Sequence, residues 1–397
     1  MAIISIGKID KDLIPIIIAC IFAFLFKLLT IIENTILFNH SIIINIYVAV
    51  SKLFSIIPFI ITKIRSKKVK REEDFDINIK YNVVEYIYID AHEKATKGKF
   101  KYILLSSTLF FIQGIILFYA TGLKINIWLS EIFIYCIFYY LIFKIKPYKH
   151  HYLSIILIIL LGIILDLILN NLQNDIINNW QMILLSLFGE ILYSLQDVID
   201  KYIMEKKFCS VYELSLYGGI INLILLGIFS IFNYYYFKLD NFEEYTNNYN
   251  YIEFLVAIGT IITQYGLDIS SLFTIKNNTP CHLFIVSAFS QIIVYIDDFS
   301  KQKVIIIIFL IFIFLLSLVF NEIIEINCFG LSKNIRRNIM NRALRDGFYS
   351  STGEIYVGNE NDDESHNEVC ENKNNIMSEL PLIPINNSND TLVNNDN

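Results

Sequence analysis

The chain has 397 residues, of which 55% are hydrophobic and only 18% are charged, and its mean hydropathy is +0.52. Because a soluble protein carries roughly 25% charged residues, this composition excludes an ordinary soluble protein and favours a protein with several membrane spans. The formal net charge of -6 is small and unevenly placed, so it does not indicate nucleic-acid binding. The six cysteines have no paired spacing, so we expect no disulfide framework, no zinc site and no cofactor.

Ten apolar segments have approximately the length that a helix needs to cross a bilayer, which is about 20 residues. The third to tenth are separated by short polar segments, which we interpret as turns, such as residues 121–126 and 170–179. The ninth is short and begins near Pro280, and proline suits the first turn of a helix. The sequence therefore predicts an all-α polytopic membrane protein with ten transmembrane helices. In chain order the segments are Leu13–Ile32, Ile43–Ile61, Tyr102–Ala120, Ile127–Phe143, Leu153–Leu169, Trp180–Tyr202, Leu214–Phe237, Phe254–Phe273, Leu283–Ile296 and Val304–Ile324.

The positions of the lysines and arginines predict the orientation of these spans. If both termini are cytoplasmic, most of the 32 basic residues fall on the cytoplasmic side, above all in residues 63–101 and in the tail. We therefore expect both termini in the cytoplasm. Residues 63–101 are expected to lie on the anionic leaflet. The tail, residues 330–397, becomes acidic and rich in asparagine and is expected to be largely disordered.

Several ionisable side chains fall at bilayer depth, where each costs at least about 2.5–3.5 kcal/mol on insertion scales. Such groups indicate a cavity, a partner or a solute pathway. Lys27 lies in the first span, while Lys52 and Glu190 lie near the middle of the second and sixth. Glu131 and Asp166 lie closer to an interface, and a side chain that reaches towards the headgroups explains them equally well.

The sixth span carries a polar stripe, because Ser186, Glu190, Ser194, Asp197 and Lys201 recur at steps of three or four residues. Gln196 and Asp200 flank this stripe. For Asp197, Asp200 and Lys201, a wet cytoplasmic helix end is an equally good interpretation.

Polar side chains in other spans have two interpretations, hydrogen bonds between helices or the lining of a cavity. The eighth span contains Gln264 and Asp268, the third contains Gln113 and the ninth contains Gln291. We predict a solute cavity lined by charged and polar side chains from both halves of the chain. Its predicted residues are Lys27, Lys52, Gln113, Glu131, Glu190, Ser194, Gln196, Asp197, Gln264, Asp268 and Gln291.

The arrangement resembles a known superfamily. The fifth and tenth spans are the least polar, so the chain looks like two five-helix halves in opposite orientation. Residues 127–131 (Ile-Trp-Leu-Ser-Glu), 144–146 and 150–152, with Gly162, are similar to the fourth and fifth helices of the drug/metabolite transporter superfamily, which includes EamA-like proteins and nucleotide-sugar transporters. In the second half, residues 189–196, 205–207 and 212–219 resemble the sixth and seventh helices of that group.

The resemblance implies a 5+5 inverted repeat, with residues 1–169 (including the cytoplasmic loop 63–101) as the first half, residues 170–329 as the second and residues 330–397 as the tail. It implies a secondary transporter that moves a small polar organic solute by alternating access. A nucleotide sugar or another anionic metabolite is one option, because lysines in a cavity favour an anionic group.

The expected partners are this solute and membrane lipids, with a homodimer left open. We expect an endomembrane (Golgi, ER or vacuole) rather than the plasma membrane. The alternative is a non-transporting membrane protein, with a sorting, structural or lipid-modifying role, whose buried charges form static salt bridges. An enzyme that acts on lipids would need a cluster of histidines and carboxylates at one interface. The sequence offers only His150 and His151 there, so we predict no enzyme.

Overall fold

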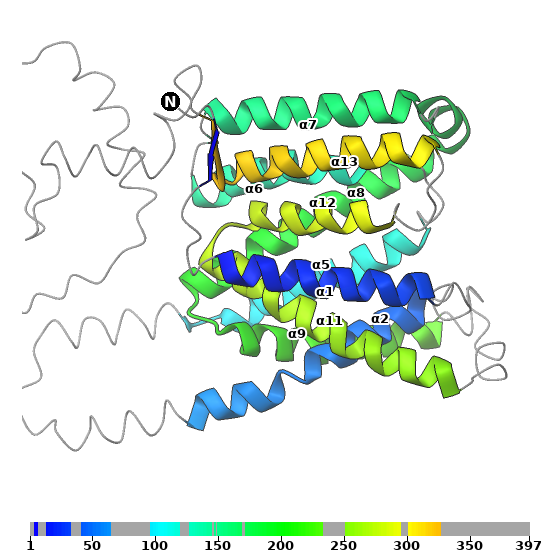
Figure 1. Ribbon diagram of the computed structural model, residues 1–397. Coiled ribbons are helices and arrows are strands. Elements are labelled where there is room, and N and C mark those ends of the chain that lie inside the picture. Colours follow the sequence, from blue (N-terminus) through cyan, green and yellow to red (C-terminus); the bar gives the residue numbers. More distant parts are fainter. Residues whose placement is uncertain are drawn as a thin grey trace, which may run out of the picture.

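The computed structural model describes residues 4–6, 13–32, 41–64, 96–119, 127–144, 147, 149–168, 171–232, 251–294 and 301–326. These residues form a bundle of long helices that run side by side (Figure 1). The helices are α1 (Ile14–Ile32), α2 (Ser41–Leu53), α5 (Lys99–Tyr119), α6 (Glu131–Phe143), α7 (Lys149–Ile168), α8 (Asn171–Lys206), α9 (Val211–Phe232), α11 (Tyr251–Asn277), α12 (Leu283–Val294) and α13 (Lys301–Phe320). Two short 3₁₀ helices, η3 (Ile127–Ser130) and η5 (Pro280–His282), precede α6 and α12.

Six of the described helical segments are long and apolar enough to cross a membrane, so the prediction of an integral, helical membrane protein is confirmed. They are Asn45–Ile64, Lys99–Ile116, Lys149–Leu167, Trp180–Lys206, Val211–Phe232 and Phe254–Asn277. Four further apolar helices are shorter, and they coincide with the remaining predicted spans: Ile14–Leu29, Ile127–Phe143, Pro280–Ile293 and Val304–Phe320. That these four also cross the membrane stays a prediction.

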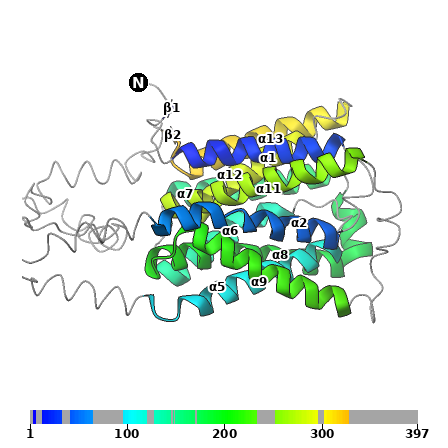
Figure 2. The ribbon, with the colours of Figure 1, turned by 90° about the horizontal axis from the view of Figure 1, so that it is seen from below.

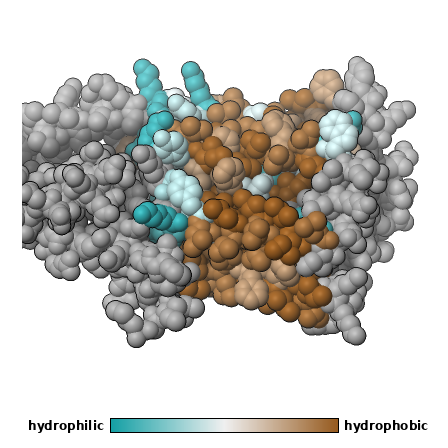
Figure 3. Space-filling model, turned by 90° about the horizontal axis from the view of Figure 1, so that it is seen from above, coloured by the Kyte–Doolittle hydropathy of each residue, from teal (hydrophilic) through white to brown (hydrophobic). Residues whose placement is uncertain are grey.

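The outer surface of the bundle is apolar over much of its length. Large hydrophobic side chains are exposed along many of the helices, for example Ile156 of α7 (62%), Ile224 of α9 (58%) and Phe312 of α13 (54%). On the face drawn in Figure 3, hydrophobic residues form a broad zone, with hydrophilic residues nearer the ends of the bundle. A contiguous apolar surface of this kind is expected to face lipid.

Each helix of the bundle has a characteristic set of neighbours. Helix α1 packs along α11 and α12, and α8 packs along α5 and α6. Helix α2 contacts α9 and α11, while α9 also contacts α5. Helices α7 and α13 pack against each other at one edge of the bundle (Figure 1).

The second predicted span is not one continuous helix. A turn at Phe54 and Ser55 follows α2, and residues 56–64 are helical again. Pro58 explains the break, because its ring clashes with the carbonyl four residues earlier, which belongs to Phe54. The amides of Phe54 and Ser55 instead donate to carbonyls three residues back, both at 3.1 Å. The helix is therefore interrupted after Leu53, one residue beyond Lys52.

The expected polar turn at residues 170–179 is absent, because α8 already begins at Asn171. This segment contains no proline or glycine that would interrupt a helix. Hydropathy detects the depth of a segment in the membrane rather than the end of a helix. The sixth helix is consequently longer than predicted, with 36 residues.

Two short strands form a ribbon that the sequence analysis did not predict. Strand β1 (Ile4–Ile6) pairs antiparallel with β2 (Ile324–Ile326), at one end of the bundle (Figure 2). Three residues are too few to show the alternating pattern of a strand. Most of the predicted cytoplasmic loop 63–101 and the whole of the predicted tail 330–397 lie outside the described residues.

Candidate functional site

A cavity of about 510 Å³ lies inside the bundle. Its volume falls in the range of small-molecule sites, which is about 300–1,000 Å³. The lining side chains come from α1, α2, α5, α8, α9, α11 and α12, and none of the described residues of α7 or α13 is among them. Polar groups from seven helices therefore meet in one space within the apolar bundle.

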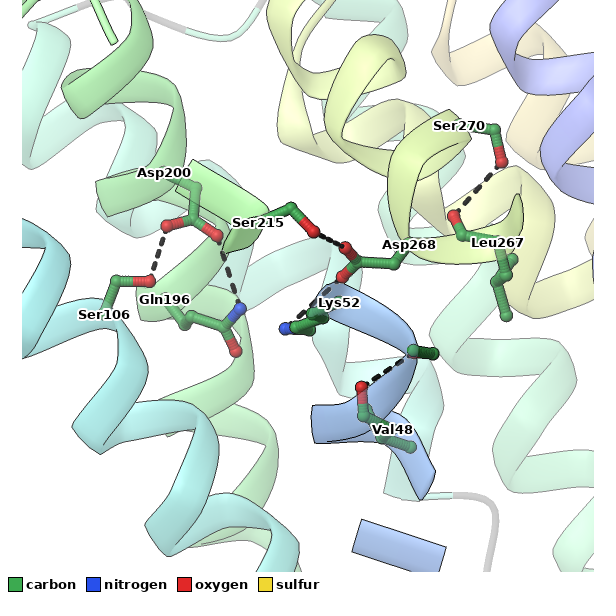
Figure 4. Close-up of polar contacts among 10 residues, drawn as sticks. Val48, Lys52, Ser106, Gln196, Asp200, Ser215, Leu267, Asp268 and Ser270 are labelled. Carbon is green, nitrogen blue, oxygen red and sulfur yellow. Dashed lines mark hydrogen bonds and ion pairs between the residues drawn. The ribbon is translucent and has the colours of Figure 1, made fainter. Parts of the chain in front are cut away.

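Lys52 enters this cavity from α2, directly before the break in that helix. Its Nζ lies 3.3 Å from Oδ1 of Asp268 on α11 and 4.0 Å from the centre of the Phe110 ring on α5. Ser215 of α9 donates its hydroxyl hydrogen to Oδ2 of the same aspartate at 2.7 Å. Figure 4 shows Lys52 and Ser215 pointing towards the two oxygens of Asp268. An ion pair and a cation–π contact thus hold the ammonium group in place.

A second carboxylate group comes from α8. Asp200 is buried, and it accepts hydrogen bonds from the Ser106 hydroxyl of α5 and from Nε2 of Gln196, the latter at 3.3 Å (Figure 4). One turn earlier, Asp197 accepts a hydrogen bond from the Tyr135 hydroxyl of α6. Both aspartates line the cavity. Their oxygens are held by neutral donors, so the donors fix the position of each carboxylate without neutralising it.

Some polar atoms of the lining are buried without a hydrogen-bond partner among the described residues. They are both amide atoms of Asn222 and Oε1 of Gln196. Buried polar groups in native proteins nearly always have a partner, because leaving one unsatisfied costs about 1–3 kcal/mol. The cavity therefore presents donors and acceptors that suit a polar occupant.

Most of the residues predicted to line a cavity do so, namely Lys27, Lys52, Gln113, Gln196, Asp197, Gln264 and Asp268. The other four, Glu131, Glu190, Ser194 and Gln291, are not among the lining residues. Glu131 is 2% exposed at the start of α6, and Ser194 is fully buried.

Lys52 and Glu190 were both predicted to line the cavity, but only Lys52 does so, and its helix α2 packs against α9 and α11. Lys52 therefore pairs with Asp268 of α11.

Several side chains that line the cavity or hold its carboxylates were absent from the prediction, among them Ser106, Tyr135, Asp200, Ser215 and Asn222. Asp200 was visible as a polar flank of the α8 stripe, but a wet helix end explained it equally well. Ser106 and Ser215 are single hydroxyls within apolar helices, a pattern that does not distinguish a cavity from an ordinary hydrogen bond between helices. Tyr135 lies in an aromatic-rich helix, and nothing in the sequence indicated that it belongs to the site.

The last member of the stripe, Lys201, has a structural role. Its Nζ donates to the carbonyls of Lys276 at 2.9 Å and Asn278 at 2.6 Å, at the end of α11, and pairs with Glu205 at 2.7 Å. A lysine that satisfies the last carbonyls of a helix is a common C-terminal cap. This side chain fastens α8 to the end of α11 rather than lining the cavity.

Comparison with family models, curated proteins and solved structures finds no match to this chain. The resemblance to the drug/metabolite transporters accordingly rests on the sequence segments given above.

Proposed function

We propose that this chain is a secondary transporter that moves a small polar organic solute across its membrane by alternating access. The observation that carries the proposal is the cavity itself, a space of about 510 Å³ within an apolar bundle, into which charged and polar side chains project. Intramembrane ionisable groups are expensive and generally mark solute or ion pathways. Here two lysines and three aspartates line the same space.

The proposal includes ten membrane spans arranged as two five-helix halves. Numbered in chain order, spans one to five are α1, α2, α5, α6 and α7, and spans six to ten are α8, α9, α11, α12 and α13. The contacts of α1 with α11 and α12 then correspond to those of α8 with α5 and α6, five places along. The contact of α2 with α11 likewise corresponds to that of α9 with α5. This recurrence supports a repeat, and a site at the interface of two repeats suits alternating access.

The solute class follows from the charges of the lining. Lys27 and Lys52 suit a phosphate or carboxylate, so nucleotide sugars and other anionic metabolites belong to the proposed class. Asp197, Asp200 and Asp268 share the cavity, so solutes that also carry an amino group belong in the same screen.

The test is solute flux in vesicles reconstituted with the purified full chain, screened across nucleotide sugars, organic acids and amino acids. We expect saturable uptake of at least one class, with competition inside that class. Empty vesicles and vesicles with an Asp197→Asn variant serve as controls. Absence of flux for every class, in preparations shown to be folded, would contradict the proposal.

The orientation is part of the proposal. We place both termini in the cytoplasm, with a tag inserted at residues 70–82 on the same side and a tag at residues 240–250 on the opposite side. Protease protection of each tag in sealed vesicles tests the orientation. Any tag on the wrong face would remove the ten-span arrangement.

The alternative is a non-transporting membrane protein with static salt bridges, and the contact of Lys52 with Asp268 favours it specifically. The two side chains are only 10% and 13% exposed and lie at ion-pair distance. A charge-swapped chain, Lys52→Asp with Asp268→Lys, separates the two candidates. Recovery of folded protein in the swapped chain, with no flux from either chain, indicates the non-transporting alternative with a static bridge. Wild-type flux that is lost or altered in the folded swapped chain indicates a solute-contacting pair.

A further inference from the structure

A cluster of potential metal ligands lies outside the cavity, where α7 begins and α13 ends. His150 and His151 occupy the first turn of α7, and Glu322 follows the end of α13. One ligand atom from each of the three side chains lies within 4.8 Å of the other two. Nε2 of His150 is 3.2 Å from Oε1 of Glu322. Sequence alone showed the two histidines, and the fold adds the carboxylate from 171 residues further along the chain.

Glu322, which contacts His150, has an unusual backbone conformation at the end of α13. Its φ is +61°, in the left-handed region where glycine is the usual residue. The following amide, of Ile323, donates to the Leu318 carbonyl at 2.9 Å, a pattern typical of a helix end. A carboxylate therefore stands where glycine would be less strained, and strained positions of this kind occur often at functional sites.

Aromatic contacts hold the histidine rings. The His151 ring lies 4.6 Å from the Phe320 ring and 4.1 Å from the His150 ring, measured between centroids. His150 is 4% exposed, while the other two residues of the cluster are half-buried. The site is thus partly enclosed and still open on one side.

The ligand types and spacing match one class of metal ion. Zinc is bound by histidine nitrogens and carboxylate oxygens at about 2.0–2.2 Å, which separates tetrahedral ligands by about 3.3 Å. The contact of His150 with Glu322 already has this separation, and the ligand atom of His151 lies within 4.8 Å of both. Mg²⁺ and Ca²⁺ prefer oxygen ligands and suit the cluster poorly.

We propose that His150, His151 and Glu322 bind a divalent first-row transition-metal ion of the zinc type, with the fourth position open. Two histidines and one carboxylate form a known kind of three-ligand zinc site. The bound ion would join the start of α7 to the end of α13. Strand β2 begins two residues after Glu322, at the same end of the bundle (Figure 1), so the ion would also stabilise the base of the ribbon.

The experiment measures binding of Zn²⁺ to the purified full chain in detergent, after treatment with a chelator, by titration calorimetry and elemental analysis. We expect about one equivalent of Zn²⁺ per chain and no binding of Mg²⁺ under the same conditions. Loss of one ligand should weaken zinc binding by about tenfold or more. The test variants are Glu322→Gly and His151→Gln.

The Glu322→Gly variant separates metal binding from folding, because glycine accepts a φ of +61° more readily than glutamate. It should therefore unfold no earlier than the wild type in the absence of metal and yet fail to gain stability from Zn²⁺. A Glu205→Gln variant removes a carboxylate elsewhere in the chain and should bind Zn²⁺ like the wild type. Zinc binding that is unchanged in both test variants, or absent from the wild type, would contradict the proposal and show that the cluster is a simple ion pair. Neither outcome depends on whether the chain transports a solute.

Discussion

Helices α2 and α9 cross closely at Gly219, beside the cavity. A Cβ atom at Gly219 of α9 would lie 2.7 Å from Cβ of Lys52 and 3.0 Å from the Ala49 carbonyl oxygen. Non-bonded carbon atoms prefer about 3.5–4.0 Å, so Gly219→Ala must push the two helices apart by roughly 1 Å. The partner atoms belong to the backbone and the base of a side chain, which cannot rotate away. We therefore expect strain of about 1–3 kcal/mol.

The same helix offers a matched control. A Cβ atom at Gly227 meets nothing within 4 Å, so Gly227→Ala gains the helix propensity of alanine, about 0.8–1 kcal/mol, without a clash. Gly219→Ala gains the same helix propensity, so the difference in stability between the two variants measures the strain at Gly219. We expect Gly219→Ala to be the less stable of the two by about 1–3 kcal/mol.

Unfolding of the purified variants in detergent measures this difference, and flux in vesicles measures its effect on the cavity. Displacement of α2 carries Lys52 away from Asp268, which is 3.3 Å from it in the wild type. We expect Gly219→Ala to lower flux and Gly227→Ala to leave flux unchanged. Equal stability and equal flux of the two variants would refute the close crossing and the placement of Lys52 that depends on it.

Three further predictions follow from the contacts described above. Lys52→Met leaves the Asp268 charge buried without its lysine and should lower the free energy of unfolding by about 3 kcal/mol, while adding Asp268→Asn should recover most of this loss in chemical denaturation. Asp197→Asn should lower uptake by about tenfold, because Asp197 lines the cavity. Glu190→Gln should change uptake little, because Glu190 is not among the lining residues. A larger loss of uptake in Glu190→Gln than in Asp197→Asn would contradict the assignment of the cavity as the solute site. Burial raises the pKa of the Cys209 thiol, so less thiolate is present at neutral pH, and maleimide labelling should be slow and should accelerate as the pH rises.

The sequence predicted the helical membrane class and most of the charged residues of the cavity lining for the same physical reason. Charges such as Lys52 and Asp268 stand out in apolar segments, because burying them in lipid is unfavourable. The partner of each charge could not be predicted in this way. Hydropathy places Lys52 and Glu190 at a similar depth, but only the packing of α2 against α11 selects Asp268 as the partner.

Other features were not predicted because their sequence signal is either weak or non-local. The break after Lys52 was in principle readable from Pro58, since proline disturbs the helix four residues earlier. The cluster of His150 with Glu322 was not readable, because a contact between the start of α7 and the end of α13 depends on the whole bundle.

The ribbon of β1 and β2 constrains the number of membrane crossings. Residues 4–6 and 324–326 are hydrogen-bonded neighbours, so they must lie on the same face of the membrane, whichever face that is. Each crossing carries the chain to the other face, and the count between the two strands must therefore be even. Among the described residues six helices are long enough to cross, so if all six cross and the other segments add no crossing, the four shorter helices add none, two or four. A nine-span arrangement, or any variant that loses a single crossing, would have to break this ribbon.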